Sequence, residues 1–243
     1  MSLLKEEELI KILPKNGPTV EEVRKYLEKY NNEFIIIKCG GGILVDPNLF
    51  KIFIKDIVVL NKLGFKPIIV HGGGKRISNK LNELNIKSNF IKGLRVTDKD
   101  TINIVEDVLI DFNREIVEAL NESSCKAKRI TTKENHIITV MQENKDLGFV
   151  GTPTEINKEL LNEIINSNEV PVIAPLGLDK NNQTFNINAD TAAGSIAIEL
   201  KARRLMIISD VEGVLDSEKK LIPEINSQKA KELIDQEVIS GGM

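Results

Sequence analysis

The 243-residue sequence has no tryptophan, only two histidines and only two cysteines. With His71 and His136 alone, histidine-rich metal sites and most catalytic triads are excluded. Cys39 and Cys125 form neither a disulfide framework nor a metal-ligand spacing, which indicates a reducing compartment. No apolar run approaches the roughly 18 residues of a membrane span, and the heavily charged N-terminus is unlike a signal peptide. These absences predict a cytoplasmic protein that does not enter a membrane.

An excess of positive charge is also lacking. Lys and Arg total 33 and Asp and Glu total 36, for a net charge of −3. A protein that neutralises a phosphate backbone needs a basic excess, so no nucleic-acid partner is expected. Apolar residues make up 41% and charged residues 28%, which is typical of a globular chain. The length allows one large α/β domain or two small ones.

Short apolar segments rich in β-branched residues recur along the chain, each running into a turn that contains glycine. Four of them have the pattern of a buried strand: 34–38, 67–71, 171–175 and 205–209. Amphipathic helical patterns lie between them, and residues 127–155 look rich in β-structure. This alternation predicts an α/β fold, a three-layer αβα sandwich with a mainly parallel central sheet. The capping-box-like spacing of Thr97 and Asp100 predicts the start of one long helix.

Two triple-glycine turns, Gly40–Gly42 and Gly72–Gly74, follow the first two predicted strands. Ligands of such sheets bind beyond the carboxyl ends of the strands, and free N–H groups at glycine turns attract phosphates and carboxylates. The alternative is that tight strand-to-helix turns need glycine anyway. Neither turn matches a P-loop or a dinucleotide-binding fingerprint. His71, which heads the second turn, is expected to be structural.

Four charged residues stand at informative positions. Lys38 ends a very apolar strand and would direct its ammonium at the first glycine turn, unless it only reaches out to water. Arg95 precedes a predicted helix, where its guanidinium suits a carboxylate; the alternative is a surface arginine. Asp190 lies near the N-terminus of a predicted helix; the alternative to a functional role is that its carboxylate only interacts favourably with the helix dipole. Asp210, taken alone, fits a structural turn.

Five segments, in this order along the chain, together resemble the amino acid kinase family. They are Lys38-Cys39-Gly40-Gly41, His71-Gly72-Gly73-Gly74, Gly93-Leu94-Arg95-Val96-Thr97, Asn186-Ile187-Asn188-Ala189-Asp190 and Ser209-Asp210-Val211-Glu212-Gly213-Val214-Leu215-Asp216. The first turn is shared across the family, whereas the third and fourth segments are more specific. They are most similar to the members that phosphorylate N-acetyl-L-glutamate, over about Thr19 to the last residue.

The resemblance implies that an ATP γ-phosphoryl group moves to a carboxylate and forms an acyl phosphate, as a step of arginine biosynthesis. It implies that Lys38 contacts the transferring phosphoryl group and that Asp190 orients the catalytic lysines. Mg²⁺ is expected to be coordinated mainly by the ATP phosphates, and no metal is expected to be held tightly by protein ligands. No general base is needed, because the acceptor is already a carboxylate and catalysis consists of positioning and positive charge.

The resemblance also assigns the binding residues. On the acetylglutamate side, Gly73 and Gly74 would face the substrate, Arg95 would pair with its α-carboxylate, and Asn186 would hold its acetylated end. On the nucleotide side, the resemblance places four residues near ATP: Gly40, Gly41, Asp210 and Gly213.

Residues 1–32 are expected to form an N-terminal arm with a helix, and residues 33–243 the kinase domain. Within that domain, about 33–177 would bind acetylglutamate, and about 178–243 would begin an ATP-binding half. The family continues after a Gly-Gly-Met sequence with a second catalytic lysine, so this chain is expected to be C-terminally truncated. The arm resembles that of hexameric members, which predicts a homo-oligomer, either a dimer or a hexamer formed through the N-terminal helix.

Three alternative functions remain open at this point. The first is a sister kinase acting on an aminoadipyl or glutamyl group attached to a carrier protein, which also presents a carboxylate to Arg95. The second is a non-catalytic protein that binds acetylglutamate, because the second lysine is missing. The third is a nicotinamide-dependent dehydrogenase, which is disfavoured since both glycine turns fail its fingerprint.

Overall fold

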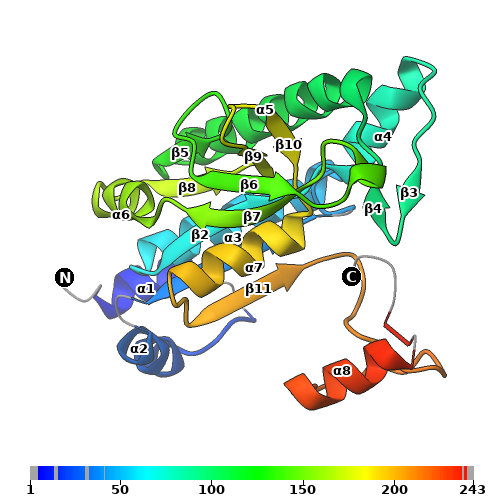
Figure 1. Cartoon of the computed structure of the whole chain (residues 1–243). Coiled ribbons are helices and arrows are strands. Elements are labelled where there is room, and N and C mark those ends of the chain that lie inside the picture. The colour runs from blue at the N-terminus through cyan, green and yellow to red at the C-terminus, as the bar shows by residue number, and fades with distance from the viewer. Residues whose placement is uncertain (1–4, 14–15, 31–32, 41, 237, 240–243) are drawn as a thin grey trace.

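Figure 1 shows the computed structural model, which describes residues 5–13, 16–30, 33–40, 42–236 and 238–239. Its centre is a five-stranded parallel sheet in the order β11-β1-β2-β8-β5. The strands are β1 (Phe34–Cys39), β2 (Lys66–His71), β5 (Ala127–Ile130), β8 (Val170–Ile173) and β11 (Arg204–Ile208). The four predicted apolar segments are therefore strands, with ends that differ by one or two residues.

Helices cover both faces of this sheet, which confirms the three-layer αβα prediction. On one face, α3 (Pro47–Lys62) and α5 (Lys99–Glu122) bury Phe53 and Phe112 against Ile37. On the other face, α6 (Lys158–Asn166) and α7 (Ala189–Glu199) pack on Ile36 and its neighbours. Because both faces are buried, β1, β2 and β8 are apolar along most of their length rather than alternating.

A second, four-stranded sheet in the order β10-β9-β6-β7 lies in front of the central one in Figure 1. It contains β6 (Ile138–Gln142), β7 (Gly151–Ile156), β9 (Leu176–Leu178) and β10 (Thr184–Asn186). The prediction that residues 127–155 are rich in β-structure is confirmed, because β5, β6 and β7 lie there. Strands β9 and β10 were not predicted, because each has only three residues and β9 follows a bend at Pro175.

The remaining elements are short. Helix α4 (Gly74–Glu83) follows the second glycine turn, and a small hairpin joins β3 (Phe90–Ile91) to β4 (Leu94–Arg95). A 3-10 turn spans Lys145–Leu147, and α8 (Ser227–Asp235) lies apart from the sheets in Figure 1. No helix in the described ranges is long and apolar enough to cross a membrane.

The N-terminal arm contains α1 (Glu6–Ile12) and α2 (Val20–Lys29). Thr19 caps α2, and Glu22 completes the capping box. The arm packs on its own chain: Val23 is buried, and the hydroxyl of Tyr30 accepts a hydrogen bond of 2.8 Å from Arg204 on β11.

The predicted start of the long helix α5 is wrong by one residue. Asp98, not Thr97, is its N-cap, and the Asp98 carboxylate accepts a 2.8 Å hydrogen bond from the Thr101 N–H. Thr97 is fully buried and strand-like, because its N–H donates to Leu147 O and its own carbonyl accepts from Phe149. Its hydroxyl is committed to the Arg95 carbonyl, so it cannot cap the helix.

Candidate active site

A cavity of about 220 Å³ lies beyond the carboxyl ends of β1 and β2. The β3–β4 hairpin, β10 and the first turn of α7 complete its wall. Seven predicted site residues line it: Lys38, Gly40, Gly73, Gly74, Arg95, Asn186 and Asp190. A larger hollow of about 590 Å³ lies between α1, α3 and the end of α5, but none of the predicted site residues lines it.

The two glycine turns touch at the floor of the cavity. The Gly72 N–H donates to Cys39 O at 2.7 Å, and a side chain on Gly72 would lie 3.3 Å from the Gly40 Cα. Gly73 is the N-cap of α4, and a Cβ there would lie 2.4 Å from the Leu109 side chain. A side chain at Gly73 would therefore have to push aside the buried Leu109 side chain. Gly41 lies outside the described residues.

Lys38 and Asp190 form an ion pair at the edge of the cavity. The Lys38 Nζ lies 3.0 Å from the Asp190 Oδ1, and the lysine side chain is only 13% exposed. Asp190 is in the first turn of α7, where Asn188 caps the helix by accepting from the N–H groups of Asp190 and Thr191. A Cβ on Gly40 would lie 3.3 Å from the Lys38 Nζ, so the ammonium sits over the first glycine turn.

Arg95 is 7% exposed and enters the cavity from β4. Its guanidinium donates to Ser88 Oγ at 2.6 Å, to Ser78 Oγ at 2.8 Å and to Gly74 O at 3.1 Å, and it lies over the Phe90 ring. All three acceptors are neutral. Burial lowers the pKa of this group, but an arginine remains protonated in proteins.

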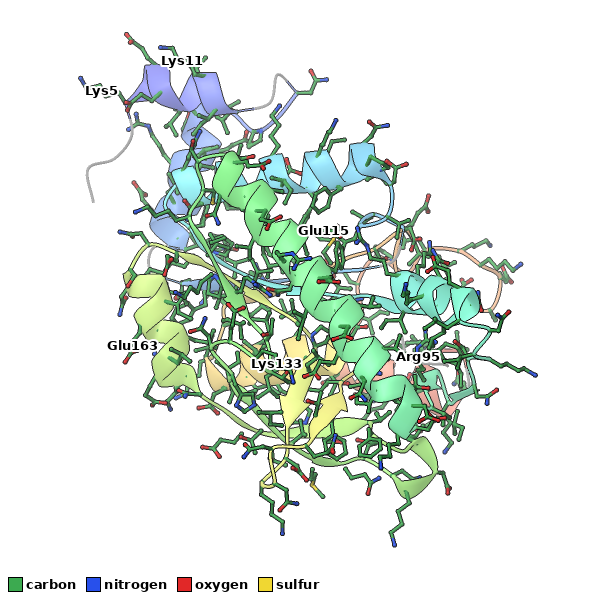
Figure 2. The ribbon with its side chains drawn as sticks, turned by 90° about the horizontal axis from the view of Figure 1, so that it is seen from above. Lys5, Lys11, Arg95, Glu115, Lys133 and Glu163 are labelled. Atoms are coloured by element: carbon green, nitrogen blue, oxygen red, sulfur yellow. The ribbon has the colours of Figure 1, made fainter. Side chains whose placement is uncertain are left out.

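No carboxylate in the described part of the chain balances the charge of Arg95, since every ion pair found there involves other residues. A buried charge without a partner is costly. Two of the five N–H groups of the guanidinium also remain without a described acceptor. The geometry therefore suits an anionic ligand in the cavity. Figure 2 shows Arg95 between α4 and the N-terminal end of α5.

Asn186 reaches the cavity from the end of β10. Its Nδ2 donates to the Thr97 hydroxyl at 3.3 Å, and that hydroxyl in turn donates to the Arg95 carbonyl at 3.1 Å. Asn186 and Arg95, 91 positions apart in the sequence, are thus joined through one buried threonine.

Asp210 and Gly213 lie outside this cavity. The Asp210 carboxylate accepts from the Gly42 N–H at 3.0 Å and from the Lys75 Nζ at 3.1 Å, and the hydrogen bond from Lys75 is the main reason that its pKa is lowered. Asp210 therefore lies beside the first glycine turn. Gly213 has a φ of +150° and packs against Leu221 instead. Within the described ranges, no three His, Cys, Asp or Glu side chains are grouped closely enough to hold a metal ion.

Several residues that support the site were not predicted from the sequence. Ser78 lies four residues after Gly74 on the same face of α4, which is a signal that was available. Ser88 carries no comparable signal. Lys75 directly follows the second glycine turn, and Asn188 lies inside a motif that was recognised, although neither was given a role.

Comparison with known proteins shows the family of the chain. Residues 33–243 match the model of the amino acid kinase family. A protein of Pelagibacter ubique (strain HTCC1062) named acetylglutamate kinase is 85% identical over 243 residues, which is all of this chain and 84% of that protein. An acetylglutamate kinase of Bradyrhizobium sp. (strain ORS 278) is 42% identical over 238 residues, covering 92% of this chain and 80% of that protein.

Solved structures share the fold. The protein smu.665 of Streptococcus mutans UA159 superposes with a TM-score of 0.77 at 32% identity, over 86% of this chain and 85% of that one. N-acetylglutamate synthase of Neisseria gonorrhoeae, complexed with coenzyme A and N-acetyl-glutamate, has a TM-score of 0.77 at 20% identity, over 88% of this chain and 50% of that one. The second likeness concerns the fold alone. By its sequence, its fold and its relatives, the chain belongs to the amino acid kinase family.

Proposed function

We propose that this chain transfers the γ-phosphoryl group of ATP to the side-chain carboxylate of N-acetyl-L-glutamate, which is a step of arginine biosynthesis. The observation that carries the proposal is the buried charge of Arg95, which no described carboxylate balances, in the same cavity as the Lys38–Asp190 pair. The names of the near relatives support the same reaction.

Arg95 is proposed to bind the α-carboxylate of acetylglutamate. A guanidinium recognises a carboxylate through two parallel hydrogen bonds, and Ser78, Ser88 and Gly74 already hold it in place. Gly73 and Gly74 would offer N–H groups at the start of α4, where the helix dipole also favours an anion. Asn186 would hold the acetylated end of the substrate.

Lys38 is proposed to act on the phosphoryl group. A carboxylate oxygen of the substrate attacks the γ-phosphorus as the bond to the β–γ bridging oxygen breaks, and ADP leaves with that electron pair. The transition state spreads negative charge over the phosphoryl oxygens, and a fixed ammonium stabilises it without reorganisation. Asp190 holds that ammonium over Gly40, which supports its assignment as the residue that orients Lys38.

The nucleotide is proposed to lie on the side of the first glycine turn, with Mg²⁺ carried on its phosphates. Gly40, Gly41, Asp210 and Gly213 are assigned to it by the family resemblance, and the bond between Asp210 and Gly42 supports this for Asp210. The division of the kinase domain at about residue 177 is part of the same proposal. Assembly into a homo-oligomer and a cytoplasmic location are also proposed; two buried free cysteines are compatible with the latter.

A hydroxylamine trap for the acyl phosphate tests the reaction. The chain is mixed with Mg-ATP and either N-acetyl-L-glutamate or a carrier-linked glutamyl substrate, with Lys38→Ala as the control. Hydroxamate formed from free acetylglutamate and lost in Lys38→Ala would support the proposal. Hydroxamate from the carrier-linked substrate alone would identify the sister kinase. Acetylglutamate binding without hydroxamate would indicate the non-catalytic alternative.

A further inference from the structure

His71, the last residue of β2, is completely buried directly beneath the second glycine turn. Its Nδ1 lies 3.1 Å from the carbonyl of Gly72, the next residue. Its Nε2 lies 3.2 Å from the Nδ2 of Asn113, which is completely buried on α5. The rings of His71 and Phe112 are nearly perpendicular, with their centroids 5.2 Å apart. His71 does not line the cavity, but the turn that it touches does.

The surrounding groups determine which nitrogen of His71 carries the proton. A carbonyl only accepts, so Nδ1 must be protonated and donate to Gly72 O. Nε2 is then a free acceptor for the Asn113 amide. That amide cannot be turned around, because its Nδ2 also donates to Val172 O at 2.8 Å. Burial lowers the pKa of His71 to about 4, so the ring is neutral near pH 7.

This arrangement leaves one polar atom unsatisfied. The Oδ1 of Asn113 is buried and has no hydrogen-bond partner among the described residues. An unpaired buried acceptor costs free energy, and such groups are rare in folded proteins. The orientation of Asn113 therefore lets its Nδ2 bond both His71 and Val172 O, while its Oδ1 is left without a described partner.

The bond from His71 fixes the direction of a neighbouring N–H. In a planar trans peptide the carbonyl of one residue and the N–H of the next point in opposite directions, and the described peptide bonds are all trans. Since the Gly72 carbonyl is turned toward the buried ring, the Gly73 N–H is turned away from it. Gly73 lines the cavity, and its N–H donates to no group in the described part of the chain.

We propose that His71, held by Asn113, is a positioning residue for acetylglutamate: it fixes the Gly72–Gly73 peptide so that the Gly73 N–H donates to an oxygen of the substrate. Neither His71 nor Asn113 touches the substrate. The inference rests on the proposed function, since it names acetylglutamate as the ligand of this turn. It replaces the expectation that His71 is merely structural.

Two substitutions of His71 distinguish the loss of the Nδ1 donor from the loss of the rest of the imidazole ring. In His71→Asn the amide nitrogen lies near the position of Nδ1 and keeps a donor for Gly72 O. In His71→Gln the side-chain amide lies near Nε2, so that donor is lost while a polar group still faces Asn113. His136→Leu is the matched control, because it removes a histidine that bonds a backbone carbonyl, Ile138 O at 2.7 Å, away from the cavity.

The measurement is steady-state kinetics with each substrate varied in turn, on variants that show a cooperative thermal transition. The expected result for His71→Gln is a rise of about tenfold in the KM for acetylglutamate, from the loss of one hydrogen bond to a charged group. The KM for ATP should stay within about twofold, and His71→Asn should recover most of the loss. His136→Leu should match the unchanged chain in both constants.

A KM for acetylglutamate that is the same in His71→Gln and in the unchanged chain would overturn the proposal. So would an equal rise of the two KM values, or a His71→Asn variant as impaired as His71→Gln, because a structural role predicts those results. A different failure belongs to the proposed function: there, the unchanged chain itself neither binds nor phosphorylates acetylglutamate.

Discussion

The Lys38 Nζ lies 3.0 Å from the Asp190 Oδ1, which joins the end of β1 to the first turn of α7. The two residues are 152 positions apart in the sequence. The pair places a largely desolvated ammonium over the first glycine turn, next to the cavity that also contains Arg95. The charge of Lys38, proposed to act on the phosphoryl group, and the charge of Arg95, proposed to bind the substrate carboxylate, are thus held on different elements.

Lys38→Ala is expected to lower kcat by at least about 10²–10³, which is the typical loss when one preorganised electrostatic stabiliser is removed. Acetylglutamate binding should change little, because Arg95 and the second glycine turn remain. The check is kcat from coupled ADP release together with calorimetric binding of acetylglutamate. Lys158→Ala, which removes an ion pair of 3.2 Å at the other end of α7, is the control. A loss of binding as large as the loss of rate would contradict the role of Lys38.

Arg95→Ala is expected to weaken acetylglutamate binding by about ten- to a hundredfold, since a hydrogen bond to a charged group contributes about 1.5–3 kcal/mol. The KM for ATP should be nearly unchanged. Arg129→Ala is the control, because the Arg129 guanidinium is already paired with Glu134 at 2.9 Å. An unchanged KM for acetylglutamate in Arg95→Ala would remove Arg95 from the site.

The burial of His71 predicts a specific pH dependence of stability. Its pKa is lowered from 6.5 to about 4 in the folded chain. The unfolded chain therefore binds the proton first as the pH falls, and the free energy of unfolding drops between about pH 6.5 and pH 4. At pH 4.5 this group alone should remove about 2–3 kcal/mol.

Chemical denaturation of the unchanged chain and of His71→Asn, at pH 7 and at pH 4.5, measures that contribution. The drop between the two pH values should be smaller in the variant by about 2–3 kcal/mol, since the variant has no imidazole to protonate. Parallel losses in the two proteins would show that His71 is protonated in the folded chain as readily as in the unfolded one.

Glu106, which is buried on α5, links that helix to β10 and to the segment that follows β5. Its carboxylate accepts from the hydroxyls of Thr132 and Thr184, and it pairs with the Lys133 Nζ at 3.2 Å. Glu106→Ala leaves buried polar groups unpaired, so we expect the free energy of unfolding to fall by about 3 kcal/mol.

The exposed Glu118 lies on the same helix, and Glu118→Ala should change the free energy of unfolding by less than about 0.5 kcal/mol. Denaturant unfolding of both variants makes the comparison. Similar small losses would show that the contacts of Glu106 are not stabilising.

The sequence by itself determined the fold class and the end of the sheet at which the candidate site lies. Apolar β-branched runs and amphipathic helices are local patterns, and two glycine turns after two such runs mark the carboxyl ends of neighbouring strands. Lys38 was identifiable for the same reason, because its position at a strand end is a local property. The resemblance to a family then supplied roles for residues that the patterns alone left open.

Only the tertiary structure decided which distant residues meet. Arg95 comes from a two-residue strand and Asn186 from a three-residue strand, too short to show a hydrophobic period. Three features depend on contacts between separate elements. They are the lack of a carboxylate partner for Arg95 among the described residues, the pairing of Lys38 with Asp190, and the burial of His71 against Asn113. Such contacts are set by packing across the whole chain, whereas a sequence pattern reports only on its own neighbours.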